Sequence, residues 1–333
     1  MSHRTILLLA ACCSLSSSSC VTGEDGPSSP DSFYRDAMRE FVQDISQWAR
    51  SASPGFIVVP QNGQELFTTF GALPGPLETE YLSVLDGTGR EDLFFGYTAD
   101  DQATPASETT WMAQFLDIAE ANGVHVLVTD YCWTQWKVDS SYSWSQGAGY
   151  ISFAADHREL DDIPGYPAEP YGLNGDDILT LGEACNFLYL IDPEVFPDRR
   201  TFVTQVSDTG YDVLILDLFY GDEQLSADDL ATLGVKPGGG SRLVLAYVSI
   251  GEAEDYRYYW QDSWTSAPPY WLYYENPDWP GNYLVDYSDP EWQSIIFGSD
   301  GSYVGRVIAS GFDGVYLDKI DSFEELEATD SDS

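Results

Sequence analysis

Positive charge is scarce in this 333-residue chain, which has 14 lysine and arginine residues against 55 acidic ones and a formal net charge of −41. Nucleic-acid binding needs a basic face that gathers phosphates, and this composition excludes such a face. Two interpretations of the charge stay open: a solvated acidic surface, or an electric field that attracts a polycationic partner.

Histidine is equally scarce, with His3, His125 and His157 as the full set. No HExxH, GxSxG or strand-following GxGxxG motif occurs, which excludes the common zinc-hydrolase, serine-hydrolase and dinucleotide-binding classes. His125 lies inside an apolar run and fits a core position better than a catalytic one. The sequence therefore predicts no cofactor and no metal site.

Long apolar runs are also missing, since none approaches the ~20 residues that span a bilayer. The start of the chain is basic, and the short apolar run Thr5–Ala11 leads into a lipobox-like sequence ending at Cys12, with Cys20 as a second lipidation candidate. We expect a lipoprotein-type signal region at residues 1–20 and a flexible tether at residues 21–33. This predicts an exported protein at the outer surface or in the periplasm, anchored by lipid or secreted.

Cysteine is rare beyond this leader, where Cys132 and Cys185 stand alone and outside any CxxC motif. In an oxidising compartment the two could form a disulfide. Two separate buried thiols are the other interpretation, and a zinc site built from cysteine and histidine is unsupported.

Core-forming residues are plentiful, at 43% hydrophobic and 14% aromatic. Apolar spacing predicts a helix over Pro30–Ser51. Short apolar or aromatic runs that end in polar residues then recur, and they provide eight strand candidates: Phe56–Val59, Leu93–Tyr97, His125–Thr129, Tyr150–Phe153, Asp212–Leu216, Leu243–Ser249, Tyr283–Val285 and Gly314–Leu317.

Eight buried runs separated by helix-length connections favour an α/β fold, a (β/α)8 TIM barrel over residues 34–327, followed by an acidic tail at residues 328–333. A doubly wound open sheet is the alternative. The helix near the N-terminus would close the ring beside the last strand, which brings the two termini together.

The predicted strands end in carboxylates, and the chain is also rich in aromatic residues, with 10 tryptophans and 22 tyrosines. In barrels of this class the active site lies where the strands end. Sugar rings stack on aromatic side chains, and glycosidic cleavage needs two carboxyl groups. The combination favours a glycoside hydrolase.

Three motifs carry a resemblance to a known family: Tyr247–Tyr256, Glu275–Asn282 and Gly311–Asp321. They resemble the endo-α-1,4-polygalactosaminidase family (glycoside hydrolase family 114) and its exported barrel relatives. Three further segments resemble other parts of that group, namely Phe56–Gly63, Asp86–Tyr97 and Val128–Cys132. The resemblance implies an exported (β/α)8 barrel that acts on galactosamine-containing polysaccharide.

The order of these segments differs from the usual order in the family. The part that resembles Asp212–Asp321 comes first in the relatives, and the part that resembles Asp31–Asp156 follows it. The chain is therefore expected to be a circular permutant, opened in the loop after the strand that ends at Asp318. Permutation is tolerated where termini lie close together on the surface.

The resemblance also implies roles for individual residues. Asp318 resembles the nucleophilic aspartate and Glu91 the acid/base glutamate, with Glu252 as a rival for either role. Lys319 would lower the pKa of Asp318 unless it points away from the cleft. Polar and aromatic residues at the other strand ends are expected to contact substrate: Glu252, Asp217, Asp130, Tyr97, Tyr247, Gln61, Asn62 and Tyr316.

The sequence thus predicts a monomeric glycosidase that cleaves α-linked, galactosamine-containing polysaccharide by a two-carboxylate mechanism. It would meet the membrane only through an N-terminal lipid anchor. A non-catalytic, cell-surface barrel that binds polysaccharide without cleaving it is the alternative, because the same aromatics and acids serve binding alone.

Overall fold

The computed structural model describes residues 30–331, and the lipidation candidates Cys12 and Cys20 lie outside them. Its helices are α1 (Pro30–Ala52), α2 (Thr79–Ser83), α3 (Ala106–Ala121), α4 (Gln135–Ala148), α5 (Arg199–Ser207), α6 (Ala227–Leu233), α7 (Pro290–Ile296), α8 (Tyr303–Ser310) and α9 (Ser322–Ser331). Its strands are β1 (Ile57–Pro60), β2 (Gly87–Glu91), β3 (His125–Tyr131), β4 (Ile151–Ala155), β5 (Phe187–Leu190), β6 (Val213–Leu216), β7 (Phe219–Tyr220), β8 (Glu223–Gln224), β9 (Leu243–Ser249), β10 (Glu252–Glu254), β11 (Leu272–Glu275), β12 (Asn282–Val285) and β13 (Gly314–Asp318).

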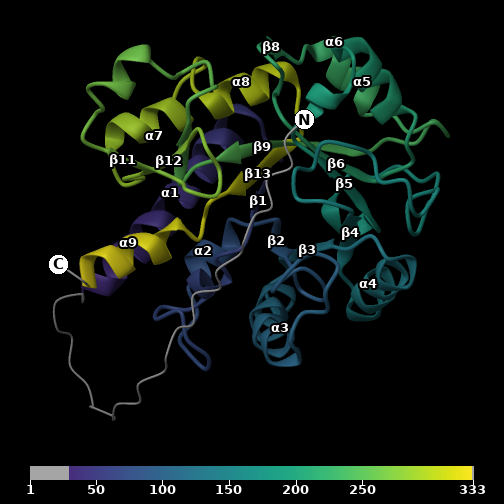
Figure 1. Cartoon of the computed structure of the whole chain (residues 1–333), viewed down its shortest axis with the longest axis horizontal. Helices are drawn as coiled ribbons and strands as arrows, with labels where there is room; N and C mark the ends of the chain where they lie inside the picture. Colours follow the sequence, from purple (N-terminus) through teal and green to yellow (C-terminus); the bar gives the residue numbers. More distant parts are fainter. Residues whose placement is uncertain (1–29, 332–333) are drawn as a thin grey trace, which may run out of the picture.

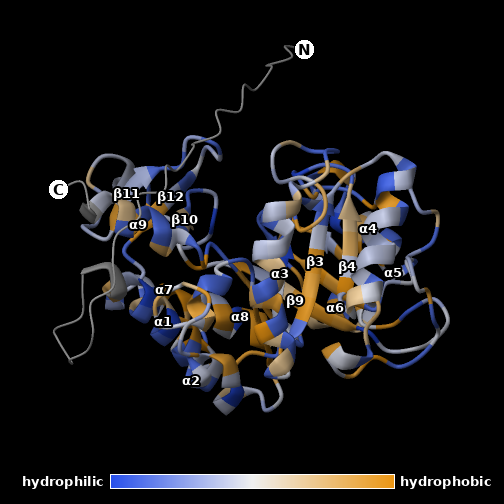
Figure 2. Ribbon diagram, turned by 90° about the horizontal axis from the view of Figure 1, so that it is seen from below, coloured by the Kyte–Doolittle hydropathy of each residue, from blue (hydrophilic) through white to orange (hydrophobic). Residues whose placement is uncertain are grey.

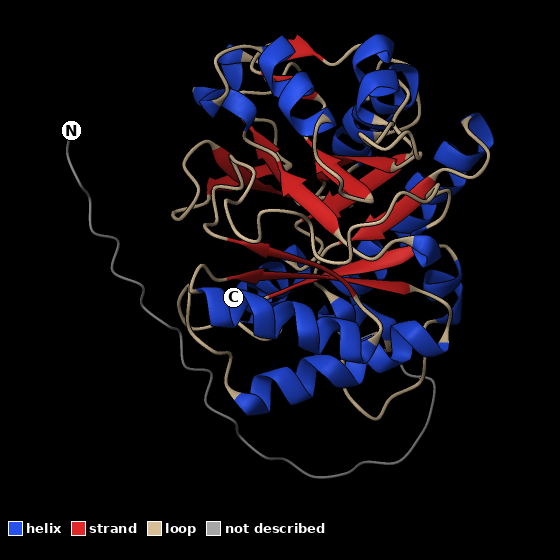
Figure 3. Ribbon diagram, turned by 90° about the vertical axis from the view of Figure 1, so that its right-hand side faces the viewer, coloured by secondary structure: helices blue, strands red, loops and turns tan. Residues whose placement is uncertain are grey.

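Parallel strands form the centre of this mixed α/β fold. One sheet has the order β1-β13-β9-β6-β5, and a second has the order β2-β3-β4. Parallel bridges connect the edges of the two sheets, from Gln61 to Gly89 and from Ser152 to Asn186. Each central strand therefore has a neighbour on both sides, and helices lie outside them (Figure 3).

The core follows from the apolar pattern of these elements. Strands β1, β4, β6 and β9 are buried along their whole length, as expected for strands covered on both faces. Figure 2 shows the hydrophobic colour gathered in strands such as β3, β4 and β9. Among the helices within residues 30–331, none is long and apolar enough to cross a membrane.

The predicted first helix is confirmed and packs beside the last one. Helix α1 turns Met38, Phe41 and Ile45 into the core. It lies alongside α9, where Arg35 pairs with Glu327 at 2.9 Å (Figure 1). Helix α1 begins at Pro30 as predicted and ends one residue later than predicted, at Ala52, and α9 covers Ser322–Ser331.

Two strand predictions need correction. The second central strand is β2 rather than Leu93–Tyr97, which forms the loop after it. The run Tyr283–Val285 is a real strand, β12, but it belongs to a small antiparallel sheet with β10 and β11. Its predicted place among the central strands is taken by β5, which pairs with β6 in parallel.

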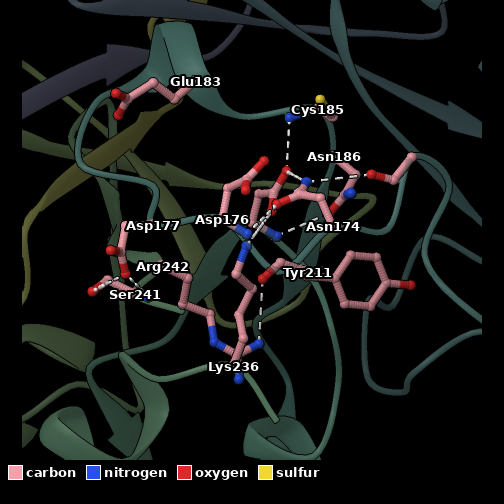
Figure 4. Close-up of polar contacts among 12 residues, drawn as sticks. Asn174, Asp176, Asp177, Glu183, Cys185, Asn186, Tyr211, Lys236, Ser241 and Arg242 are labelled. Carbon is pink, nitrogen blue, oxygen red and sulfur yellow. Dashed lines mark hydrogen bonds and ion pairs between the residues drawn. The ribbon is translucent and has the colours of Figure 1, made fainter. Parts of the chain in front are cut away.

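At the amino ends of the strands, a buried charge pair is enclosed by hydrogen bonds (Figure 4). Lys236 Nζ lies 2.9 Å from Asp212 Oδ1, and their side chains are 1% and 0% exposed. Asn174 Nδ2 donates to both carboxylate oxygens of Asp212, and the backbone N–H of Cys185 donates to Oδ2. Partners on every side offset the cost of burying these charges.

The disulfide considered from the sequence is not formed, because Cys132 and Cys185 are both free. Cys132 directly follows β3 at its carboxyl end, whereas Cys185 precedes β5 at its amino end. Parallel strands place these two positions at opposite ends of the sheet. Cys132 is buried and Cys185 is exposed.

Candidate active site

Three neighbouring strands bring the two predicted catalytic carboxylates to one edge. Strand β1 lies between β13 and β2, with Pro60 opposite Leu317 and Gln61 bridged to Gly89. Asp318 is the last residue of β13, and Glu91 is the last residue of β2. Because the strands are parallel, both side chains lie at their carboxyl ends, where barrel enzymes carry their active sites.

Glu91 accepts a hydrogen bond on each of its carboxylate oxygens. The Tyr131 hydroxyl donates to Oε1, and Asn62 Nδ2 donates to Oε2 at 2.9 Å. The backbone N–H of Glu91 in turn donates to Asn62 Oδ1 at 3.2 Å. Two neutral donors thus orient this carboxylate.

Asp318 lies in a less polar setting. Burial raises its pKa to about 7, and the negative charge of nearby Glu91 acts in the same direction. The Tyr247 hydroxyl, which donates to Oδ2 at 2.7 Å, opposes this rise. The raised pKa leaves Asp318 partly protonated near neutral pH.

Tyrosines form the floor beneath the two carboxylates. The ring of Tyr189 meets that of Tyr316 edge-on, with centroids 5.2 Å apart, and the Tyr189 hydroxyl donates to Gln61 Oε1. The Tyr316 hydroxyl faces Gly89 so closely that a Cβ there would lie 1.9 Å away. Tyr316 and Gln61, both predicted to contact substrate, are buried in this layer.

The backbone is unusual at the ends of these three strands. Asn62, Asp92 and Lys319 each have φ near 60°, in the left-handed region that non-glycine residues rarely occupy. They directly follow Gln61, Glu91 and Asp318. Strained conformations of this kind cluster at functional sites, because the surrounding structure forces a side chain into a required position.

Glu252 is buried and already bound on both oxygens. Lys319 Nζ lies 2.9 Å from Oε1, Asn276 Nδ2 donates to Oε1 at 2.8 Å, and Asn282 Nδ2 approaches Oε2 at 3.4 Å. Burial lowers the pKa of Lys319, but the Glu252 carboxylate outweighs this effect and raises it. Glu252 therefore holds Lys319 through a buried ion pair.

Asp217 also has an internal partner. Arg257 contacts it at 2.7 Å and contacts Glu254 at 2.6 Å, and all three are buried. Burial raises the pKa of Asp217, and the arginine opposes the rise. The arginine occupies this carboxylate, so the predicted substrate contact of Asp217 is replaced by an internal ion pair.

Asp130 has a structural role as well. Its Oδ1 accepts the backbone N–H groups of Phe94 and Phe95, and its Oδ2 accepts the Ser141 hydroxyl. Burial raises its pKa to about 6. Fully buried, Asp130 fixes the loop after Glu91 and cannot reach a sugar. Tyr97, in the same loop, is 47% exposed and remains available to substrate.

Sequence reasoning missed a group of residues around Glu91. Arg158 lies over the ring of Tyr131, 4.1 Å from its centroid, and pairs with Asp92 at 2.8 Å and Asp100 at 2.6 Å. Burial raises the pKa of Asp92 to about 7, although Arg158 opposes the rise. One sign of this group was present in the sequence, the charged residue Asp92 directly after Glu91. Its partner Arg158 comes from a distant segment, so the contact could not be read from local sequence.

One group among residues 30–331 has the composition of a metal site. Ligand atoms of Asp156, His157 and Asp162 lie within 4.8 Å of one another. The histidine already contacts carboxylates through both ring nitrogens, Asp156 at 2.7 Å and Asp161 at 2.5 Å. A protonated histidine accounts for this arrangement, since burial lowers its pKa but the carboxylates raise it overall.

Two surface cavities lie away from the carboxylates. One, of about 440 Å³, is lined by residues such as Arg242, Leu243 and Asp313 near the amino ends of β9 and β13. The other, of about 450 Å³, lies between β11 and α9. Neither is lined by Asp318 or Glu91, so chemistry rather than cavity size identifies the candidate site.

Comparison with known proteins agrees with the motifs of the C-terminal part. Residues 197–333 match the model of glycoside-hydrolase family GH114. The resemblance expected from the sequence is thereby confirmed for this segment. The GH114 segment contains Asp318, Tyr247 and the Lys319–Glu252 pair, whereas Glu91 comes from outside it.

Curated relatives match over a similar length. An uncharacterized protein from Thermotoga maritima is 43% identical over 121 residues, which is 36% of each chain. An uncharacterized protein from Methanocaldococcus jannaschii is 42% identical over 37% of this chain and 34% of its own length. One from Deinococcus radiodurans is 39% identical over 38% of each. The chain therefore matches a little over a third of each relative.

Proposed function

We propose that this protein is a glycoside hydrolase that cleaves α-linked, galactosamine-containing polysaccharide with Glu91 and Asp318. One observation carries the proposal: two carboxyl groups on strands that flank β1 lie close enough for the charge of one to raise the pKa of the other. Glycosidic cleavage needs such a pair, one group to protonate the leaving oxygen and one to act as nucleophile or base. The GH114 match of the segment that contains Asp318 supports the same chemistry.

The roles within the pair follow from where the proton lies. The family resemblance makes Asp318 the nucleophile, which must be ionised, and Glu91 the acid, which must be protonated. In the free protein Asp318 has the raised pKa, while both oxygens of Glu91 accept hydrogen bonds. For the roles that the resemblance assigns, Asp318 has to lose its proton and Glu91 has to carry one in the complex with substrate.

Leaving-group chemistry decides between the two role assignments. An acid/base variant keeps activity on aryl glycosides with acidic phenol leaving groups, because these need no protonation. A nucleophile variant does not. We expect Glu91→Gln to cleave such a substrate and Asp318→Asn to fail; the opposite pattern would exchange the roles.

The proposed substrate class rests on charge. Amino sugars with free amines are cations, and the chain has a formal net charge of −41. Such a field raises the local concentration of a polycation. Increasing ionic strength should therefore raise KM for a deacetylated polymer more than for its fully acetylated form. Equal salt effects on the two polymers would argue against this substrate class.

We also propose that the parallel strands close into a ring. We infer a closed (β/α)8 barrel in which α1 covers the junction between β13 and β1. Bridges at both junctions between the two parallel sheets and the packing of α1 against α9 support closure. A circular permutation would also confine a colinear family match to one segment, as found for residues 197–333.

The central test is the release of reducing ends from partly deacetylated α-1,4-galactosaminogalactan. We expect Asp318→Asn and Glu91→Gln each to lower kcat/KM by about 10³-fold or more with unchanged circular dichroism. Asp177→Asn is the matched control, because this exposed carboxylate lies at the amino ends of the strands (Figure 4). A wild-type protein that binds the polymer without releasing ends would favour the non-catalytic barrel instead.

A further inference from the structure

Three tryptophans near the candidate site are exposed, although large aromatic rings normally pack inside. Trp133, Trp136 and Trp144 are 53%, 60% and 48% exposed, whereas Trp271 and Trp292 are completely buried. Trp136 and Trp144 are eight positions apart on α4, so both lie on the same helix face. Exposed apolar area of this size on a monomer usually marks a contact surface.

The indole rings are held in fixed orientations. Trp144 stacks face to face on Phe95, with centroids 5.5 Å apart and planes 5° from parallel. Trp136 meets the same ring edge-on at 6.3 Å. Phe95 is fully buried, so it anchors both tryptophans from below and leaves their outer surfaces free. A rigid aromatic surface binds with little loss of side-chain entropy.

This surface continues into the loop that follows Glu91, the last residue of β2. Phe95 lies four residues after Glu91. Its backbone N–H donates a hydrogen bond to Asp130 Oδ1 at 3.1 Å. Trp133 lies two residues beyond the end of β3, the strand paired with β2. Its backbone N–H donates a hydrogen bond to Asp101 Oδ1 at 3.1 Å. The tryptophans are therefore joined to the candidate catalytic residue through short, hydrogen-bonded segments.

We propose that Trp133, Trp136 and Trp144 form a stacking platform for sugar units of a polysaccharide chain beyond the point of cleavage. The proposal rests on the proposed function and extends its site. The C–H faces of sugar rings pack on indole faces, and an ammonium group on an amino sugar gains a cation–π contact. Trp136 already shows such a contact, because Lys137 Nζ lies 5.6 Å from its ring centroid.

A polymer is the occupant that fits the position of the platform. Trp133 lies between the carboxyl end of β3 and the start of α4, and the other two tryptophans lie on α4 itself. We expect a long chain that passes Glu91 and Asp318 to reach these rings, and a short oligosaccharide bound at the carboxylates not to reach them. The platform therefore contributes to polymer binding and not to the chemistry of cleavage.

The test compares a polymer with a short substrate. We expect Trp133→Ala and Trp136→Ala each to raise KM for partly deacetylated galactosaminogalactan about 3- to 10-fold, with kcat and trisaccharide kinetics unchanged. Trp111→Ala is the matched control, since this α3 tryptophan is 41% exposed and packs on Phe115 instead. Equal losses on polymer and trisaccharide, or none on the polymer, would overturn the platform.

Binding in an inactive background separates this proposal from the proposed function. Asp318→Asn should still sediment with insoluble polymer, and adding Trp133→Ala and Trp136→Ala should release it. If the wild type cleaves nothing but the double tryptophan change abolishes sedimentation, the platform stands and the glycosidase proposal fails. If that change leaves polymer binding intact but removes binding to lipid vesicles or to a second protein, the platform is assigned to the wrong partner.

Discussion

Buried carboxylates at the two ends of the parallel strands lie in opposite electrostatic surroundings. At the amino ends, Asp212 faces a lysine ammonium, an amide and a backbone N–H, so its charge is compensated directly. At the carboxyl ends, Asp318 has only neutral donors, the Tyr247 hydroxyl and the Lys319 backbone N–H, and a second carboxylate, Glu91, lies nearby. The same chemical group is stabilised at one end and left in an unfavourable setting at the other.

This difference separates the part of the molecule that holds the fold from the part that carries the candidate site. A compensated buried pair contributes specific structure and has no tendency to exchange protons. A carboxyl with a pKa near 7 changes its protonation at working pH, which is what acid–base catalysis requires. Left-handed residues after β1, β2 and β13 add to the strain at the carboxyl ends.

The largest expected effect comes from breaking the amino-end pair. Lys236→Met leaves Asp212 as an uncompensated buried charge and should lower the free energy of unfolding by about 3–5 kcal/mol. Urea denaturation measures this change. The double variant with Asp212→Asn is the control, and it should recover much of the loss because no lone charge remains. A loss within about 1 kcal/mol in the single variant would contradict the comparison.

At the carboxyl ends, we expect the stability of the folded protein to fall as the pH rises. Because the folded-state pKa of Asp318 is raised to about 7, the folded protein binds a proton that the unfolded chain releases near pH 4. This group therefore adds stability at low pH and loses it as the pH rises from about 4 to 7. Asp92, with a pKa of about 7, acts in the same direction.

Asp318→Asn should remove part of that slope. We expect its midpoint in urea to exceed the wild-type midpoint at neutral pH and to approach it near pH 4, measured across a pH series. Asp177→Asn serves as the control, since a backbone N–H donor lowers the pKa of this exposed carboxylate. A slope unchanged by Asp318→Asn would show that other carboxyls account for the pH dependence.

Sequence patterns located most central strands because buried strands are continuous apolar runs. Strand β2 is the exception, since Gly87–Glu91 contains no large apolar residue. Its Gly89 is required by the hydroxyl of Tyr316, which approaches from β13, a distant part of the chain. The apolar run after β2 resembles a strand but is bent into a loop by the Asp130 carboxylate.

The error over β5 has another cause. Phe187–Leu190 and Tyr283–Val285 are both short apolar runs, and local pattern does not distinguish a central strand from one in an excursion. Their difference is tertiary: β5 is buried throughout, whereas β12 is partly exposed and pairs antiparallel. Counting eight runs gave the right number with two wrong members, Leu93–Tyr97 and Tyr283–Val285.

For the site, the sequence predicted that Asp318 and Glu91 stand at strand ends, and the structure brings them to neighbouring positions. Their catalytic roles remain predictions. The sequence did not indicate which carboxylates are already occupied, because the partners of Asp217 and Glu252 are cations placed by the fold. Burial and pairing, rather than residue type, separate the free carboxylates from the occupied ones.

The smallest expected effect tests the side-chain donor to Asp318, the Tyr247 hydroxyl. Tyr247→Phe removes a hydrogen bond that favours the ionised form, so the pKa of Asp318 should rise further above 7. The limb of the kcat/KM profile that depends on this ionisation should then move to higher pH by about one unit, since a hydrogen bond to a charged group is worth about 1.5–3 kcal/mol. Tyr189→Phe is the matched control, because its hydroxyl donates to Gln61 and not to Asp318. If both variants move the limb equally, the environment of the tyrosine floor, and not the Tyr247 hydrogen bond, sets the ionisation of Asp318.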